Sequence, residues 1–248
     1  MNPTVLRLIA CLALCAAPFS AWGRQSIAFA APVKDGTENP PAAATRQADA
    51  KELARHGIHD PRFFTHQVDS RRMLLCTFDL DDGLIPDEVW HAARKDAALA
   101  TWWSRIDAAA GQSWIRCETL CQLRPHVPAE LRAGKPEWHA AVTGLKPEKE
   151  AEYRTLHANV WPGVIDAIGQ SGIPRFDLFL LELDGKLRLF YLLEFTGKDF
   201  ANDTAAMGKS PVNQRWWKFT DTCQEPLPGA AAKKQIWEDM ALLATPTE

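Results

Sequence analysis

The stretch that decides the fold is Phe176-Asp-Leu-Phe-Leu-Leu-Glu-Leu183, followed by Asp184-Gly185 and the run from Leu187 to Phe195. Apolar runs on either side of an Asp-Gly pair are typical of a β-hairpin, because these residues tolerate the positive φ angles of a two-residue turn. A helix is expected just before it, from Pro162 to Gln170, with proline at the first position. The sequence thus predicts a helix that leads into a hairpin.

The same order of elements occurs earlier in the chain. In the first half of the chain we expect a helix at 48–55, a hairpin with strands at 63–68 and 72–78, and a helix at 86–98. Landmarks that recur 114 or 115 positions apart are Gly57-Ile58 and Gly172-Ile173, Trp102-Trp103 and Trp216-Trp217, and Asp107 and Asp221. Agreement of several landmarks at nearly one offset indicates an internal repeat.

Each repeat places a hairpin between helices, and the apolar run from His139 to Leu145 supplies an opening strand to the second. The order β-α-β-β-α-β is the ferredoxin-like arrangement, in which helices cover one face of a sheet. A second copy packed sheet to sheet would cover the other face. We therefore expect an α+β fold of tandem ferredoxin-like domains, packed as a pseudo-dimeric α+β barrel. Whether two chains form a homodimer beyond this intrachain pseudo-dimer is left open.

The N-terminus has the character of a secretory signal. Arg7 precedes an apolar run, residues 8–17, that is too short to span a bilayer, and cleavage is expected after Gly23, Ala30 or Ala31. We therefore expect an exported protein, periplasmic or secreted, without a membrane span. The expected divisions are a signal peptide at 1–31, a flexible leader at 32–46, a first domain at 47–123, a linker at 124–137 and a second domain at 138–244.

Composition narrows the function further. The net charge is −3 and no long Lys/Arg run occurs, which argues against a nucleic-acid partner. The histidines lack metal-site spacing, so no metal site is expected. Export would allow disulfides, whose pairing the sequence leaves open, among Cys76, Cys117, Cys121 and Cys223.

The candidate site begins at Tyr153. Residues four apart on a helix share a face, so we expect Tyr153, His157 and Trp161 to point the same way as Val164 and Ile168. A titratable imidazole in line with an apolar stripe could border a pocket, or it could be a core histidine with both nitrogens satisfied. Adjacent residues on a helix point about 100° apart. Whether both Trp216 and Trp217 face such a pocket is therefore left open.

Three segments of the second domain resemble the L-rhamnose mutarotase family. They are Gly144-Leu-Lys-Pro-Glu-Lys-Glu-Ala-Glu-Tyr153, the pattern Tyr-x-x-x-His-x-x-x-Trp-Pro at 153–162, and Gln214-Arg-Trp-Trp-Lys218. The resemblance covers residues 138–243 and implies a dimeric α+β barrel. It also implies an isomerase that interconverts the α and β anomers of L-rhamnose or a related hexopyranose and needs no cofactor.

The resemblance also implies roles for single residues. His157 would be the proton donor, and the sugar would contact Tyr153, Phe176, Trp216 and Trp217. The family usually has Tyr where this chain has Phe176, so one hydroxyl is missing and the substrate can differ from rhamnose. Mutarotation opens and recloses the sugar ring by proton transfer, which suits an imidazole with a reference pKa of roughly 6.5.

Two other functions compete with this hypothesis. One is an exported sugar-binding protein that turns nothing over, and the other, by analogy of fold alone, is a cofactor-free oxygenase or haem-interacting protein. At an offset of 115, Tyr153 corresponds to Glu38 and His157 to Ala42. We therefore expect residues 47–123 to be a degenerate, catalytically inactive copy that covers the second sheet. A binding role for Trp102 and Trp103 is left open.

Overall fold

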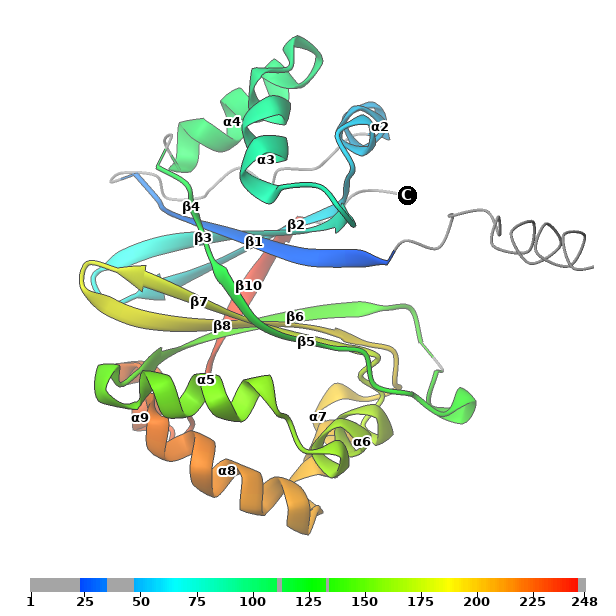
Figure 1. The fold of residues 1–248 in the computed structure, drawn as a ribbon, viewed down its shortest axis with the longest axis vertical. Coiled ribbons are helices and arrows are strands. Elements are labelled where there is room, and N and C mark those ends of the chain that lie inside the picture. The colour runs from blue at the N-terminus through cyan, green and yellow to red at the C-terminus, as the bar shows by residue number, and fades with distance from the viewer. Residues whose placement is uncertain (1–22, 35–46, 111–112, 133, 245–248) are drawn as a thin grey trace, which may run out of the picture.

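The computed structural model describes residues 23–34, 47–110, 113–132 and 134–244 (Figure 1). Most of the expected signal peptide and leader lies outside these ranges. The N-terminal half contains β1 (Arg24–Pro32), α2 (Gln47–Arg55), β2 (Ile58–Val68), β3 (Arg71–Asp81), α3 (Pro86–Lys95), the 3₁₀ turn η2 (Ala97–Leu99), α4 (Ala100–Ala110), β4 (Ile115–Arg116) and β5 (Glu118–Leu123). A short 3₁₀ turn, η3 (Ala129–Leu131), connects it to the C-terminal half.

The C-terminal half repeats this order and adds short elements near its end. It contains β6 (Glu137–Leu145), η4 (Pro147–Lys149), α5 (Glu150–Ala158), α6 (Pro162–Gln170), β7 (Arg175–Leu183), β8 (Lys186–Phe195), α7 (Phe200–Ala205), η5 (Met207–Lys209), α8 (Pro211–Cys223), β9 (Gln224–Glu225), α9 (Pro228–Ala232) and β10 (Glu238–Ala244). The expected helix at 162–170 and the two hairpins are confirmed.

The recurring glycines have a conformational reason. Gly57 and Gly172 follow α2 and α6 with φ angles of 75° and 77°, the left-handed region that glycine adopts at little cost after a helix. Asp184 and Gly185 also have positive φ, 51° and 72°. Consecutive positive φ angles form the hairpin turn whose twist matches the flanking strands.

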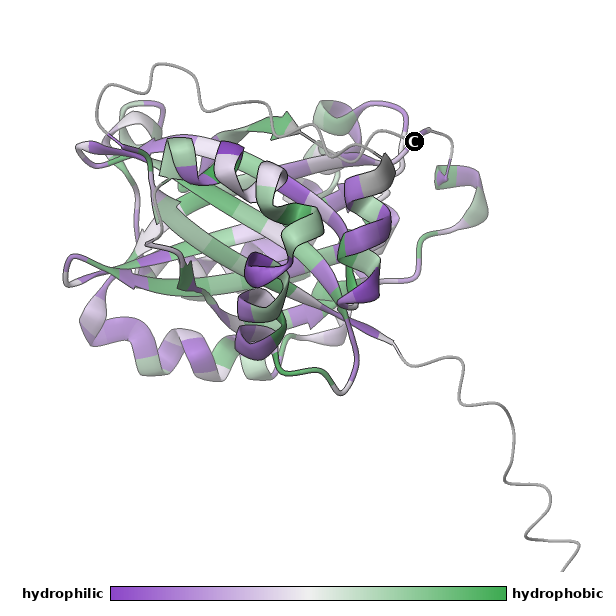
Figure 2. Ribbon diagram, turned by 90° about the horizontal axis from the view of Figure 1, so that it is seen from above, coloured by the Kyte–Doolittle hydropathy of each residue, from purple (hydrophilic) through white to green (hydrophobic). Residues whose placement is uncertain are grey.

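The strands form one 10-stranded sheet in the order β4-β1-β3-β2-β10-β6-β8-β7-β5, with β9 beside β6. Figure 1 shows two sheet layers face to face, with α2, α3 and α4 on one outer side and α5 to α9 on the other. In Figure 2 the strands are mostly green, whereas purple residues concentrate on the helices and loops. This is the expected α+β barrel, with helices covering the outer face of each layer.

Two strands lie beside the opposite half of the chain. β5 pairs with β7, and β10 pairs with both β2 and β6. The barrel is nearly closed between β1 and β5 by a side chain, because the Gln122 amide donates to the Ser26 carbonyl (2.8 Å) and accepts from the Ser26 N–H (3.2 Å). Strand pairing therefore does not follow the domain boundary expected at residue 123.

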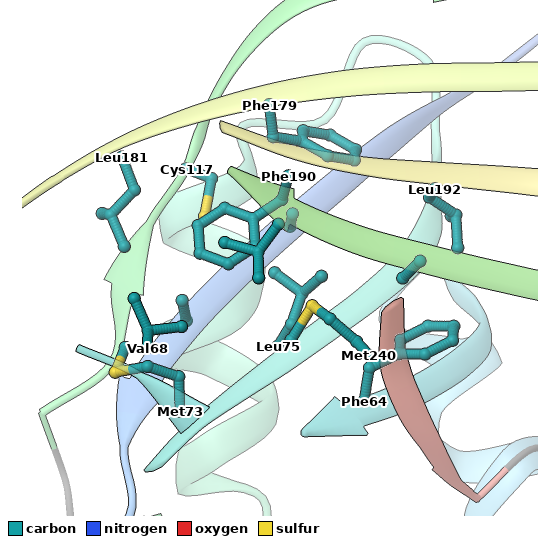
Figure 3. Close-up of a cluster of buried hydrophobic side chains, with 14 of the residues drawn as sticks. Phe64, Val68, Met73, Leu75, Cys117, Phe179, Leu181, Phe190, Leu192 and Met240 are labelled. Carbon is teal, nitrogen blue, oxygen red and sulfur yellow. The ribbon is translucent and has the colours of Figure 1, made fainter. Parts of the chain in front are cut away.

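The space between the two layers is filled with apolar side chains from both halves. Figure 3 shows Phe64 and Leu75 of the N-terminal half facing Phe179 and Phe190 of the C-terminal half. All four are fully buried. The barrel interior is therefore a packed core of apolar side chains from both halves.

A cluster of buried charges connects the layers at one end of the barrel. Arg175 of β7 donates to Asp79 of β3 (2.9 Å), to Asp177 (2.6 Å) and to the Ser26 hydroxyl of β1 (2.8 Å). Asp177 also accepts from Arg124 (2.5 Å). Since the paired groups come from both halves, this cluster fixes how the layers face each other.

The position of β1 bears on where a signal peptide could be removed. The strand begins at Arg24, pairs with β3 along its whole length, and is buried from Ser26 to Ala31. Cleavage after Gly23 would leave β1 intact, whereas cleavage after Ala30 or Ala31 would remove most of it. Of the three expected cleavage sites, only the first is compatible with this sheet.

In the N-terminal half, tryptophans fill the layer between helices and sheet. Trp90 stacks on Phe29 at 4.1 Å between ring centroids, and Trp103 packs edge-on against Trp90 and donates its indole N–H to the Ala93 carbonyl. Trp102 and Trp103 are 2% and 3% exposed. These two indoles are therefore core residues of α4.

No helix in the described part of the chain is long and apolar enough to cross a membrane.

Candidate active site

A cavity of about 660 Å³ lies in the C-terminal half, between the outer face of the sheet and the helices. Strands β7, β8 and β10 form its floor, and α5, α6 and α8 form its walls. It is lined by all five expected site residues, His157, Tyr153, Phe176, Trp216 and Trp217. A cavity of this volume falls in the range of small-molecule sites.

α5 positions His157 and Tyr153 as neighbours on one helical face. Their rings lie 4.1 Å apart between centroids, and both line the cavity, Tyr153 at 1% and His157 at 9% exposure. The expectation that Trp161 continues this face is wrong. α5 ends at Ala158, and Trp161 stands in an extended conformation before Pro162, since proline disfavours a helical residue ahead of it. Trp161 instead packs against Trp216 at 5.3 Å.

The hydrogen bonds of His157 determine its tautomer. Its Nδ1 lies 3.0 Å from the Tyr153 carbonyl oxygen, which can only accept, so Nδ1 carries the proton. Burial lowers the pKa of His157 to about 4, and the hydrogen bond to the carbonyl opposes this shift only in part. At neutral pH the ring is therefore uncharged, and its Nε2 is a base to which no described residue donates a hydrogen bond. The reference value of roughly 6.5 is not retained in this pocket.

Tyr153 is held by a second polar group of the cavity. Gln224, the first residue of β9, donates from its side-chain amide to the Tyr153 hydroxyl at 3.2 Å. Burial is the main reason that the pKa of Tyr153 lies well above its usual value, so the phenol stays protonated. Its own proton remains available to a ligand oxygen.

The two indoles of α8 differ in how far they are buried. Trp216 is 5% exposed and contacts His157 edge-on at 5.5 Å, whereas Trp217 is 37% exposed. Both line the cavity. Indole faces next to a pyranose provide apolar area, and each indole adds an N–H donor. Trp217 is therefore the more accessible of the two to solvent.

Several residues of this cavity were not predicted from the sequence. The floor includes Tyr191 of β8. The C-terminal segment contributes Trp237 and Asp239, which reach the cavity because β10 pairs with β2 of the N-terminal half and with β6. The chain has only two tyrosines, Tyr153 and Tyr191, and both line the cavity. That count was the one signal in the sequence that could have pointed to Tyr191.

The cysteines form no disulfide and the acidic residues no metal site in the described part of the chain. Cys76, Cys117, Cys121 and Cys223 are all free thiols in this structure. Among the described residues, no three His, Cys, Asp or Glu side chains gather closely enough to hold a metal ion. Asp221, which also lines the cavity, has a pKa raised by burial.

The half of the chain that contains the cavity is similar to known proteins. Residues 139–243 match the model of the L-rhamnose mutarotase family. An L-rhamnose mutarotase of Jannaschia sp. is 35% identical over 92 residues, which cover 37% of this chain and 84% of that protein. The chain belongs to the L-rhamnose mutarotase family. A second member, from Mesorhizobium japonicum, is 30% identical over 33% of this chain and 73% of its own length.

The similarity to mutarotases covers residues 139–243 and so includes His157 and both tyrosines of the cavity. The similarity of fold extends further. A monooxygenase-like protein of Fusobacterium nucleatum superposes with a TM-score of 0.51 at 11% identity, covering 90% of this chain and 94% of that one. At this identity the match shows the fold alone. Both halves of this mutarotase-family chain therefore belong to one α+β barrel.

Proposed function

We propose that the protein is a sugar mutarotase, which interconverts the α and β anomers of L-rhamnose or a related hexopyranose. Membership of the mutarotase family supports a carbohydrate isomerase. The single observation that carries the proposal is a neutral imidazole, His157, beside a protonated phenol in a cavity of about 660 Å³ with two indoles. Export remains a prediction, as does the inactivity of the N-terminal copy.

We assign both proton transfers to His157. Its Nε2 takes the proton of the anomeric hydroxyl as the bond between C1 and the ring oxygen breaks and C1 becomes an aldehyde carbon. The imidazolium then gives this proton to the ring oxygen. One nitrogen can serve both oxygens because both are bonded to C1 in the closed ring. Rotation about the C1–C2 bond and the reverse transfers close the ring on the other face.

The low pKa of His157 suits the second transfer. An imidazolium formed in a pocket that disfavours its charge is a stronger acid than an exposed one, so it gives the proton up readily. The Tyr153 hydroxyl, which accepts a hydrogen bond from Gln224, can donate to a sugar oxygen and so stabilise the open-chain form of the sugar. The remaining surfaces, Trp216, Trp217 and Phe176, provide apolar contact with the C–H groups of the sugar.

Exchange NMR of the anomeric protons tests the proposal directly. With L-rhamnose, L-fucose and L-mannose in turn, we expect micromolar protein to broaden or exchange the α and β signals of at least one sugar well beyond the buffer rate. Heat-denatured protein is the control. Saturation transfer from protein to sugar without faster exchange would instead identify a non-catalytic sugar-binding protein.

The pH dependence of the rate provides an independent prediction. The active form of His157 is neutral, so its activity is complete above the lowered pKa and is lost as pH falls through about 4. We expect an enzymatic rate, corrected for the buffer, that is nearly level from pH 6 to 8 and falls only in more acidic buffer. An acid limb centred near 6.5 would contradict the burial argument.

The same lowered pKa affects stability. The unfolded chain binds a proton on this histidine below about 6.5, whereas the folded chain does not until about 4. Folding stability from this group therefore falls as pH decreases from about 6.5 to about 4. Urea unfolding of the wild type and of His157→Ala at pH 7 and pH 5 measures the difference, which should shrink in the variant.

A further inference from the structure

Three residues on neighbouring strands form a row across the floor of the cavity. Tyr191 of β8 is paired with Ala141 of β6, and Ala141 is paired with Asp239 of β10. Directly opposed residues on neighbouring strands project from the same face of a sheet. Both Tyr191 and Asp239 line the cavity. The residue between them, Ala141, has only a methyl group as its side chain.

Neighbouring rings hold Tyr191 in place. Phe176 lies 5.6 Å away and Trp237 lies 5.0 Å away, measured between ring centroids, so the phenol is packed between two aromatic side chains. Burial, and then the charge of Asp239, raise the pKa of Tyr191, so the hydroxyl is protonated at neutral pH. Among the described residues, none forms a hydrogen bond with this hydroxyl. A fixed donor that borders a cavity without a partner is available to a ligand.

Asp239 complements this donor with an acceptor. It is an exposed residue at the cavity edge, and within the described ranges no cation pairs with its carboxylate. The rest of the strand floor is apolar, with Phe176, Leu178 and Leu193. Polar groups on this floor are therefore concentrated at the Tyr191–Asp239 row. His157 belongs to the opposite wall, since α5 lies over the sheet (Figure 1).

We propose that Tyr191 and Asp239 bind the hydroxyls of the sugar on ring carbons remote from the anomeric carbon. The phenol donates to one oxygen, and the carboxylate accepts from the neighbouring hydroxyl. With the anomeric carbon at His157 on the helical wall, the far edge of the ring faces the strand floor. The ligand class is thus a pyranose with hydroxyls on adjacent carbons, such as C3 and C4. The inference rests on the proposed function only in taking the ligand to be a sugar.

Two conservative variants test the inference, each with binding and turnover measured separately. With a sugar that the wild type binds, we expect Tyr191→Phe to weaken affinity by about 2- to 10-fold, as for one neutral hydrogen bond. Asp239→Asn should weaken it by about 10-fold or more, because a charged acceptor is replaced by a neutral one. Both should raise KM and leave kcat within about twofold, since neither residue reaches the anomeric centre. Glu182→Gln, an exposed carboxylate of β7 that does not line the cavity, is the control.

Deoxy sugars then locate the contact. For an analogue that lacks the hydroxyl bound by Tyr191, the wild type and Tyr191→Phe should have equal affinity. Affinities of both variants equal to the wild type, with a sugar that the wild type turns over, would overturn the inference and leave the mutarotase proposal intact. A loss of kcat at constant KM would also overturn it.

The two proposals can fail separately. If the wild type binds a sugar without accelerating anomer exchange, the mutarotase proposal fails, and a loss of that binding in the two variants still supports the inference. If the wild type neither binds nor turns over any sugar of the panel, both fail. Far-UV circular dichroism of each variant establishes that it is folded, and Asp239→Asn at the exposed edge provides the test should Tyr191→Phe be unfolded.

Discussion

His157→Ala should reduce the protein-dependent rate of anomer exchange by about 100-fold or more, since general acid–base groups typically contribute that much. The variant removes the one imidazole that lines the cavity among the described residues, and it leaves Tyr153, Trp216 and Trp217 in place. Sugar affinity should therefore change by only a few-fold. The measurement is anomer-exchange NMR at saturating sugar, together with saturation-transfer binding.

His91→Ala is a matched control, because His91 is exposed on α3 in the other half and does not line the cavity. It should retain the full rate. An unchanged rate in His157→Ala would place the acid–base group elsewhere in the cavity, with Asp221 the next residue to substitute. Loss of both binding and rate with a normal circular dichroism spectrum would instead indicate that His157 mainly holds the sugar.

The largest effect on stability is expected from Arg175→Met. The guanidinium donates to Asp79 and Asp177, and the side chain of Asp177 is 0% exposed. Removing the cation leaves the buried Asp79 carboxylate without its ion-pair partner and leaves Asp177 with Arg124 alone, and breaking a buried pair in this way typically costs about 3–5 kcal/mol. Because the cluster spans β1, β3 and β7, the variant should also weaken the docking of the two layers. Urea unfolding at pH 7 measures the free energy.

The control is Arg55→Ala on α2, where the arginine side chain is 72% exposed and pairs with Glu52 across one helical turn. An exposed pair of this kind contributes about 0–1 kcal/mol. A cost of less than about 1 kcal/mol for Arg175→Met would show that water reaches the cluster readily, a result that the burial of Asp177 argues against. A second unfolding transition in this variant would reveal the two halves separating before they unfold.

Local sequence patterns located much of the fold. The Asp184-Gly185 turn fixed a hairpin, and the recurring Gly57 and Gly172 marked helix ends that require positive φ. The spacing of Tyr153 and His157 placed both rings on one face of α5, as observed. The same spacing did not predict the position of Trp161, because α5 ends at Ala158 and Trp161 is extended before Pro162. These features depend on residues within one or two turns of each other, and a sequence displays such relations directly.

The pairing of β5 and β10 with strands of the opposite half could not be predicted in the same way, since it joins residues far apart in the chain. It brings Trp237 and Asp239 to the floor beside Tyr191, and none of the three was a candidate from sequence. The environment of His157 was equally hidden. Its spacing suggested a titratable group with an ordinary pKa, whereas burial lowers the pKa to about 4.

The sequence by itself therefore determined the order of helices and strands, the two-fold repetition of that order, and the neighbourhood of Tyr153 and His157. Each of these follows from turn chemistry or helical period. The tertiary structure alone decided which half has an open cavity and which is filled by Trp90, Trp102 and Trp103. The reason is that cavity volume and burial are properties of packing among distant segments, and the same Trp-Trp pair forms a core in one half and a cavity wall in the other.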